Sequence, residues 1–398
     1  MADDTPTFDP RTVAVRGGLT RSQFDETAEA IFMTSGYVYK TAAEAEAAFA
    51  SKTQTRFVYS RYANPTVAMF EERLRQLEGA EACRATASGM AAVFAALMVL
   101  VRAGDRVVAS RALFGSCHYI IAELLPRYGV TTEFVDGADL NAWETALSKP
   151  AKAVFLETPS NPMLSLVDLR RVAKLAHAAG ARVVVDNVFA TPLLQKPLLL
   201  GADVVVYSAT KHIDGQGRSL GGAILGKREF IDSELKPFLQ HTGPALSPFN
   251  AWTLVKGLET MALRVDAQCK SALAIAKHLE GRKGVRRVLY PGLPSFPQAD
   301  LVCAQMSGGG TIVCIELEGG KDAAFRCMDA FQVIDISNNL GDSKSLVCHP
   351  ATTTHHRIGP EERAKLGISD GVLRLSVGLE AESDLIADLE RGLAEADF

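Results

Sequence analysis

Short apolar runs alternate with helical segments between residues 64 and 225. Five of the runs have the length and valine-rich character of strands buried on both faces of a sheet. They are DRVVAS (105–110), AKAVFLETP (151–159), ARVVVDN (181–187), DVVVYS (203–208) and GGAILG (221–226). The intervening segment VDLRRVAKLAHAAG (167–180) has apolar residues at helical spacing. This alternation predicts an α/β fold with a mainly parallel sheet flanked by helices.

The sequence on either side of this region follows other patterns. The first sixty residues show little apolar periodicity apart from TAAEAEAAFASK (41–52), which predicts a helix, so we expect an arm that packs against another surface. Residues 253–280 predict one long helix or two consecutive ones, and the remainder predicts a smaller α+β domain. We therefore expect an N-terminal arm (1–63), a large domain (64–255) and a C-terminal domain (256–398).

Composition and charge favour a small-molecule partner. The 398 residues are 47% hydrophobic and 22% charged, which is ordinary for a globular protein, and the formal net charge is −4. No block of lysine and arginine is present, which argues against nucleic acid or an anionic membrane as partner. The longest apolar run, AAVFAALMVLV (91–101), is too short to span a bilayer.

The cysteines and histidines indicate neither disulfides nor a metal site. The seven cysteines form no CxxC pair, and the N-terminal residues contain no apolar signal region, so we expect reduced thiols in a cytoplasmic protein. The histidines of CHPATTTHHR (348–357) match no ordinary zinc pattern, and we expect no metal.

Polar residues follow three of the predicted strands at the point where each strand ends. Asn161, Asp186 and Lys211 fall at these ends, and ligands of parallel sheets bind beyond the carboxyl ends of the strands. A desolvated lysine can form a Schiff base, and a nearby carboxylate can keep a heteroaromatic nitrogen protonated. Pyridoxal phosphate (PLP) requires this pair of groups.

A phosphate site is also present in the sequence. Ser88, Gly89 and Met90 open the apolar helix predicted within residues 85–97, and the free N–H groups of a helix N-terminus attract anions. Each feature alone has an ordinary structural interpretation, as a solvated strand end, a turn residue or a helix cap. Their order and their common position at the strand ends favour a PLP site.

Several motifs resemble those of the Cys/Met-metabolism PLP-dependent enzymes. They are YSRYANPT (59–66), ASGMAA (87–92), ETPSNP (157–162), DNVFATP (186–192), YSATKHIDGQGRSLGG (207–222), CHPATTTH (348–355) and LRLSVGLE (373–380). The resemblance runs from about residue 12 nearly to the C-terminus. It implies PLP-dependent transferase fold type I, which is the fold of aspartate aminotransferase.

The resemblance also implies roles for individual residues. Lys211 would hold the cofactor covalently and move protons, Asp186 would pair with the pyridine nitrogen, and Asn161 with the ring hydroxyl. The remaining cofactor contacts would come from Ser88, Gly89, Met90, Phe114, Ser208 and Thr210. Tyr59 and Arg61 would reach into the active site of a neighbouring subunit, which implies a dimer that pairs into a homotetramer.

Three residues are predicted to bind the substrate. Arg374 interrupts the apolar segment VLRLSV, where an unpaired guanidinium would be costly. The resemblance implies that Arg374 binds the α-carboxylate of the substrate and that Asn339 helps to orient this carboxylate. An outward-facing arginine is the alternative. Lys344 stands where many lyases of the family have an acidic residue, and it would suit an ester with a distal carboxylate; the alternative is a solvated surface lysine.

The expected reaction is a γ-replacement that converts O-succinyl-L-homoserine and sulfide to L-homocysteine and succinate in methionine biosynthesis. Phe114 replaces a family tyrosine and has no hydroxyl, so proton transfer falls to Lys211, with Tyr59 as a second candidate. Cystathionine γ-synthase, O-acetylhomoserine sulfhydrylase and γ-lyase activities remain alternatives. A non-catalytic PLP-binding regulatory protein is a further alternative, which Arg374 disfavours because cofactor binding alone requires no carboxylate recognition.

Overall fold

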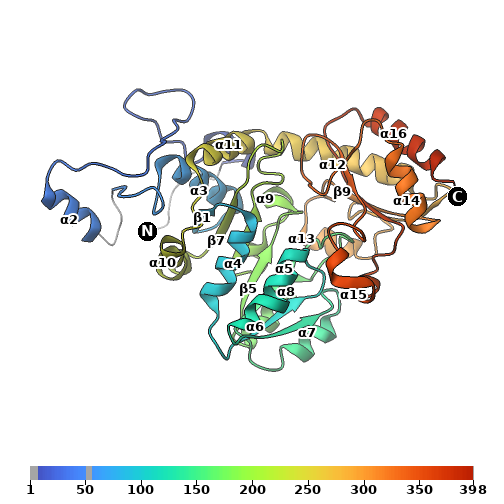
Figure 1. Ribbon diagram of the computed structural model, residues 1–398, viewed down its shortest axis with the longest axis horizontal. Coiled ribbons are helices and arrows are strands. Elements are labelled where there is room, and N and C mark those ends of the chain that lie inside the picture. Colours follow the sequence, from blue (N-terminus) through green and yellow to red (C-terminus); the bar gives the residue numbers. More distant parts are fainter. Residues whose placement is uncertain (1–7, 51–55, 398) are drawn as a thin grey trace.

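The largest unit of the computed structural model, which describes residues 8–50 and 56–397, is a seven-stranded sheet (Figure 1). The strand order is β1-β7-β6-β5-β4-β2-β3, with parallel pairing from β6 to β3 and antiparallel pairing of β7 with β1 and β6. The strands are β1 (Ala82–Thr86), β2 (Arg106–Ser110), β3 (Thr131–Val135), β4 (Ala153–Glu157), β5 (Arg182–Asp186), β6 (Val204–Ser208) and β7 (Gly222–Gly226). The predicted α/β class with a mainly parallel sheet is confirmed.

Helices cover both faces of this sheet. Successive residues of β5, Val183 and Val184, belong to two separate apolar clusters, and both side chains are fully buried. A strand buried on both faces gains from apolar residues at every position, which explains its uninterrupted valines. The helices of this region are α3 (Pro65–Glu78), α4 (Gly89–Leu100), α5 (Gly115–Tyr119), η1 (Ile120–Leu124), α6 (Leu125–Arg127), α7 (Leu140–Ala146), α8 (Leu169–Ala178), α9 (Thr191–Leu194), η2 (Pro197–Leu200), η3 (Phe230–Leu235) and α10 (Lys236–Thr242).

A second, five-stranded sheet follows two long helices. The helices are α11 (Pro248–Glu259) and α12 (Met261–Leu279), so the predicted helical stretch is two helices that meet at Thr260. The sheet has the order β10-β11-β12-β9-β8. Its region contains β8 (Val285–Leu289), α13 (Ala299–Gln305), β9 (Ile312–Leu317), α14 (Gly320–Asp329), β10 (Asp335–Ile336), β11 (Leu346–Cys348), η4 (His356–Ile358), α15 (Gly359–Lys365), β12 (Val372–Ser376) and α16 (Glu382–Glu395). The smaller α+β unit is therefore present, while the predicted boundaries at 63/64 and 255/256 stay predictions.

The N-terminal segment is anchored to the large unit at Glu29, its root, and extends away from the molecule after this residue. Glu29 receives hydrogen bonds from Arg73 (2.6 Å) and Lys256 (2.5 Å), and the Arg73 side chain is fully buried. Burial alone would raise the pKa of Glu29, but the two hydrogen bonds outweigh it and lower this pKa to about 2. Beyond this anchor the chain runs outward to α2 (Ala42–Ala50), which has no buried residue (Figure 1). This helix confirms the one predicted over 41–52, whose last two residues lie outside the described residues.

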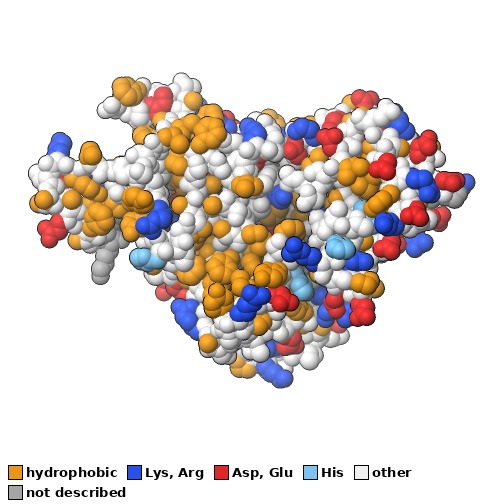
Figure 2. Space-filling model, in the orientation of Figure 1, with side chains coloured by type: hydrophobic (Ala, Val, Ile, Leu, Met, Phe, Trp, Pro, Cys, Tyr) orange, Lys and Arg blue, Asp and Glu red, His pale blue; other side chains and the backbone are white. Residues whose placement is uncertain are grey.

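Large apolar side chains are exposed on this segment. Phe24, Met33, Val38 and Phe49 are between 67% and 90% exposed, and Figure 2 shows apolar atoms gathered on the extension that carries α2. Contiguous exposed apolar surface of this kind marks a site of contact with another surface. The short helix α1 (Pro10–Arg16), in contrast, packs against α3 and α11.

Two general features concern cysteines and membranes. All seven cysteines are free thiols, and most are buried. Within the part of the chain that the structure describes, no helix combines the length and the apolar content needed to cross a membrane.

Candidate active site

A pocket of about 230 Å³ lies where the carboxyl ends of the large sheet's central strands face the small sheet. The strands β4, β5 and β6 contribute Glu157, Asp186 and Ser208, each at its last residue. The N-terminus of α4 and strand β12 complete the wall. The lining residues are Ser88, Gly89, Met90, Val93, Phe114, Cys117, Glu157, Asn161, Asp186, Val188, Phe189, Ser208, Thr210, Lys211, Leu220, Asn338, Leu340 and Arg374.

Lys211 stands in this pocket three residues after β6 ends. Its Nζ donates a hydrogen bond to Oδ1 of Asn339 at 2.5 Å. Burial, with a further contribution from the nearby Arg374 charge, lowers the pKa of the Lys211 amine to about 8. A neutral, nucleophilic amine is therefore far more populated here than on a solvated lysine.

Two carboxyl groups face the same space, the buried Glu157 and the partly buried Asp186. Asp186 accepts a hydrogen bond from the backbone N–H of Val188 (3.1 Å), and Glu157 accepts one from the backbone N–H of Phe114 (2.8 Å). Burial raises the pKa of both groups, and the charge of Asp186 raises that of Glu157 further. Among the described residues, no lysine or arginine forms an ion pair with either one. The pocket thus contains two carboxyl groups, those of Asp186 and Glu157, that could pair with a cation of a bound molecule.

The N-terminus of α4 and the end of β6 lie close together, and their hydrogen-bond donors form a concave group, the donor cradle. Ser88 caps the helix, its Oγ accepting from the N–H of Ala91 (3.2 Å). A Cβ at Gly89 would lie 2.6 Å from Cβ of Ser208, so only glycine permits this approach. The free N–H groups of the first helical turn and the hydroxyls of Ser208 and Thr210 together suit a phosphate group.

Arg374 lies on β12, and its side chain is buried and directed into the pocket. Its two Nη atoms donate to Oδ1 of Asn161 (3.0 Å) and to the backbone carbonyls of Asn338 (2.9 Å) and Asn339 (3.1 Å). Its Nε has no hydrogen-bond partner, and no carboxylate of the described chain pairs with the guanidinium. A fixed, positively charged fork with a free donor suits a substrate carboxylate.

Glu157 and Asn338 were not predicted from the sequence as site residues. Glu157 carried a usable signal, because it closes the apolar segment 151–159 in the same way that Asp186 closes 181–187. Asn338 contributes only its backbone carbonyl, and no side-chain pattern could have indicated it.

Asn339 does not line this pocket but accepts hydrogen bonds from Lys211 and Arg374, which do. Three further predicted residues lie outside the pocket. Lys344 is 60% exposed, with its Nζ 3.2 Å from Oδ1 of Asp342. Arg61 donates to the backbone carbonyl of Gln240 and lies over the ring of Tyr62, and Tyr59 is 43% exposed. The roles assigned to these three residues stay predictions.

The histidines that follow β11 make hydrogen bonds to nearby chain atoms. His349 bonds to Thr352 and to the backbone carbonyl of Asp370, and His355 bonds to the backbone carbonyl of Asn161. Over residues 8–50 and 56–397, no group of three or more His, Cys, Asp or Glu side chains is placed to hold a metal ion.

Comparison with known proteins gives matches over nearly the whole chain. Residues 11–394 match the family described as Cys/Met metabolism PLP-dependent enzyme. The chain is 62% identical to an O-succinylhomoserine sulfhydrylase of Mycobacterium tuberculosis over 387 residues, which cover 96% of this chain and 95% of that protein. It is 51% identical to an O-succinylhomoserine sulfhydrylase of Pseudomonas aeruginosa, covering 96% and 94%. It is 42% identical to an L-methionine gamma-lyase of Pseudomonas putida, covering 91% of each chain.

Solved structures give the same result for the fold. Cystathionine gamma synthase from Xanthomonas oryzae pv. oryzae superposes with a TM-score of 0.93 at 34% identity, covering 99% of both chains. A putative O-acetylhomoserine (thiol)-lyase from Campylobacter jejuni, whose structure contains N'-pyridoxyl-lysine-5'-monophosphate, superposes with a TM-score of 0.91 at 31% identity, covering 97% of this chain and 100% of that one. The predicted fold type I is confirmed.

Proposed function

The chain belongs to the Cys/Met metabolism PLP-dependent enzymes, and we propose that it converts O-succinyl-L-homoserine and sulfide to L-homocysteine and succinate. The observation that carries this proposal is its identity, at 62% and 51% over almost the full length, to two relatives from different organisms that share the name O-succinylhomoserine sulfhydrylase. Family membership also confirms the predicted cofactor, PLP.

The residues of the pocket fit PLP. Asp186 is a partly buried carboxyl group that no lysine or arginine of the described chain pairs with, and a protonated ring nitrogen supplies a cation. The donor cradle at the N-terminus of α4 fits the phosphate, Asn161 fits the ring hydroxyl, and Phe114 can stack on the ring. When bound to Lys211, PLP supplies an electron sink that stabilises negative charge on the substrate carbon beside it.

The chain's own groups position the substrate and move its protons. Arg374 binds the α-carboxylate, and Asn339 links this anchor to Lys211, since its backbone carbonyl accepts from Arg374 and its side chain accepts from Lys211. Lys211 takes the proton from the α-carbon and returns protons later. A pKa near 8 lets this amine act both as base and as acid close to neutral pH. Phe114 cannot share this task, because it lacks a hydroxyl.

We further propose that the active enzyme is a homodimer, paired into a homotetramer, in which Tyr59 and Arg61 serve the neighbouring active site. The exposed apolar side chains on the extended N-terminal segment support this assembly, because they need a covering surface. Free thiols at all seven cysteines agree with a cytoplasmic location, which is part of the proposal.

Product analysis tests the reaction. The purified holoenzyme is incubated with O-succinyl-L-homoserine plus sulfide, plus cysteine, or with no thiol, and homocysteine, cystathionine and 2-oxobutyrate are quantified. Homocysteine should dominate with sulfide. Predominant cystathionine with cysteine would assign a synthase instead, and 2-oxobutyrate in every arm would assign a lyase. Lys211→Ala is the control, and unchanged turnover in it would contradict the mechanism.

The ester preference needs a separate experiment on Lys344. KM is measured for the O-succinyl and O-acetyl esters of homoserine with the parent enzyme and with Lys344→Ala. A rise in KM for the succinyl ester alone would support contact between Lys344 and the distal carboxylate. Equal effects on the two esters would remove Lys344 from the substrate site.

A further inference from the structure

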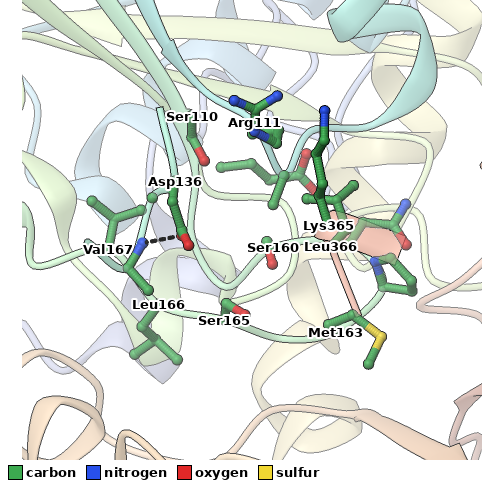
Figure 3. A pocket seen from close by; sticks show the side chains of 16 residues that line it. Ser110, Arg111, Asp136, Ser160, Met163, Ser165, Leu166, Val167, Lys365 and Leu366 are labelled. Carbon is green, nitrogen blue, oxygen red and sulfur yellow. Dashed lines mark hydrogen bonds between the residues drawn. The ribbon is translucent and has the colours of Figure 1, made fainter. Parts of the chain in front are cut away.

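A second pocket of about 350 Å³ lies beside the active site (Figure 3). It shares Glu157 and Asn161 with the active pocket, and its other walls come from the ends of β2 and β3, from residues 160–167 and from α15. The reaction described above uses none of these other walls.

Two buried hydroxyl groups in this pocket lack hydrogen-bond partners. Ser110 and Ser160 are 1% and 2% exposed, and the Oγ of each has no partner in the structure. Figure 3 shows the Ser160 hydroxyl near the middle of the pocket, with Ser110 above it. A Cβ on Gly137 would lie 2.6 Å from the Ser110 Oγ, so the missing side chain keeps this hydroxyl accessible. Buried hydroxyls are normally satisfied, and two unsatisfied ones in one cavity point to a polar ligand.

Charges of both signs stand at the opening of the pocket. Arg111 and Lys365 both donate hydrogen bonds to the carboxylate of Glu362, with nitrogen–oxygen distances of 3.0 and 2.5 Å. The two cations and one anion together carry a net charge of +1. Asp136 accepts a hydrogen bond from the backbone N–H of Ala138 (3.0 Å), and no cation of the described chain pairs with it. A ligand that carries both an anionic and a cationic group would complement this opening.

The opposite end of the pocket is apolar. Met163 and Leu166 are buried, line it and lie away from Ser110 and Arg111 in Figure 3. The buried Val167 lies on the side of Ser110, since a Cβ on Gly137 would meet both. An aliphatic group would be shielded from water there. A dicarboxylate fits less well, because its second anion would face either Asp136 or this apolar surface.

We propose that this pocket is a second ligand site that binds a small aliphatic amino acid as the zwitterion. The α-carboxylate faces Arg111 and Lys365, the ammonium group faces Asp136, and the side chain packs on the apolar end. The hydroxyls of Ser110 and Ser160 hydrogen-bond to the two charged groups. The site differs from the active site in its walls and requires no cofactor.

Calorimetric titration of the holoenzyme tests this site. The probe is N-methyl-L-leucine, a zwitterion whose secondary amine cannot displace Lys211 from the cofactor as a primary amine can. The visible absorption of the cofactor is recorded in parallel. We expect binding with an unchanged visible spectrum. No binding heat up to about 10 mM probe, a concentration that corresponds to very weak affinity, would overturn the proposal.

Two variants and a second probe test the geometry. Ala138→Trp at the exposed rim should block the pocket, and Asp136→Asn should weaken binding at least about tenfold. Glu133→Gln, on the strand β3 that ends directly before Asp136 but outside the pocket, is the matched control and should bind as the parent does. The deaminated analogue 4-methylpentanoate should bind at least about tenfold more weakly than the amino acid. Equal affinity for the two probes, or binding unaffected by either pocket variant, would overturn the proposal. Unchanged thermal unfolding of each variant verifies its fold.

Discussion

Asp186 lies directly opposite Glu157 in the parallel pairing of β5 with β4, so two carboxyl groups end neighbouring buried strands. Burial raises the pKa of both groups, although Asp186 is only partly buried, and the charge of Asp186 disfavours ionisation of Glu157. Glu157 is therefore the partner whose pKa is raised by both burial and a neighbouring charge, while its Oε2 accepts from the N–H of Phe114.

Because the raised pKa of Glu157 disfavours its charged form, we expect the neutral side chain of glutamine to replace it well. Glu157→Gln keeps an acceptor for the Phe114 N–H and should change the free energy of unfolding by less than about 1 kcal/mol. Glu157→Ala leaves that buried N–H unsatisfied and should cost about 1–3 kcal/mol. Urea unfolding of the cofactor-free protein measures both. Equal losses in the two variants would show that Glu157 is needed as a charged group.

The lowered pKa of Lys211 predicts the pH dependence of cofactor attachment. With a pKa of about 8, about one amine in ten is neutral at pH 7, against about one in 3,000 for an ordinary lysine. The rate at which cofactor-free protein regains its visible absorption with PLP should rise between pH 6 and 8 and level off above. Circular dichroism over the same range verifies the fold. A rate that keeps rising to pH 10 would contradict the lowered pKa.

Arg374→Lys tests the carboxylate fork. Lysine cannot donate two parallel hydrogen bonds, so the kcat/KM for O-succinyl-L-homoserine should fall at least about a hundredfold, equivalent to roughly 3 kcal/mol. The cofactor's visible absorption should remain. Arg287→Lys, at a partly exposed ion pair with the buried Glu316, is the matched control and should keep parental activity. A kcat/KM within a few-fold of the parent in Arg374→Lys would exclude the assigned role.

Gly89→Ala tests the close approach of α4 to β6. The added methyl group would overlap Ser208 and push the helix N-terminus away from the strand end. We expect PLP to dissociate at least about tenfold more readily, and the protein to lose about 1–3 kcal/mol of stability. Gly36→Ala is the control, because a Cβ there meets nothing within 4 Å. Unaltered PLP affinity in Gly89→Ala would show that the cradle does not bind the phosphate.

The pKa of Glu29 predicts how the root of the N-terminal segment responds to acid. Because folding lowers this pKa from 4.5 to about 2, its stabilising effect is complete above pH 4.5 and is lost as the pH falls toward 2. Glu29→Gln removes the closer of the two carboxylates that pair with the buried Arg73, leaving Glu259 at 3.7 Å, and should cost up to about 3 kcal/mol at pH 7. The difference from the parent should shrink between pH 4.5 and 2 in urea unfolding. A difference independent of pH would argue against the charge as its cause.

The sequence predicts the central strands of the fold well and the edge strands poorly. Strands such as β5 are buried on both faces and appear as continuous valines. The strands β1 and β3 were not predicted, and they are the two edges of the large sheet. Arg84 on β1 pairs with Glu71, and Glu133 on β3 pairs with Arg106, so polar residues interrupt both patterns. An edge strand tolerates such residues, and apolar periodicity alone cannot detect it.

For the site, the sequence indicates a residue's position best where that position follows from a strand, while the roles of these residues stay predictions. Asp186 and Lys211 follow buried strands, and the chain brings them to one pocket with Asn161 and Arg374. The position of Lys344 depends on the path of a loop, which the sequence pattern does not determine. Any contribution of Tyr59 depends on a second subunit, so the fold of one chain cannot reveal it.

Arg374 belongs to the small sheet, whereas its partner Asn161 belongs to the loop after β4 of the large one. A carboxylate held by Arg374 next to PLP would therefore connect two bodies of the protein. The fit of that carboxylate would then depend on the angle between the two sheets, because this angle sets the distance from Arg374 to PLP. Substitutions along α11 and α12, far from any substrate atom, would consequently change the affinity for the substrate if they change that angle.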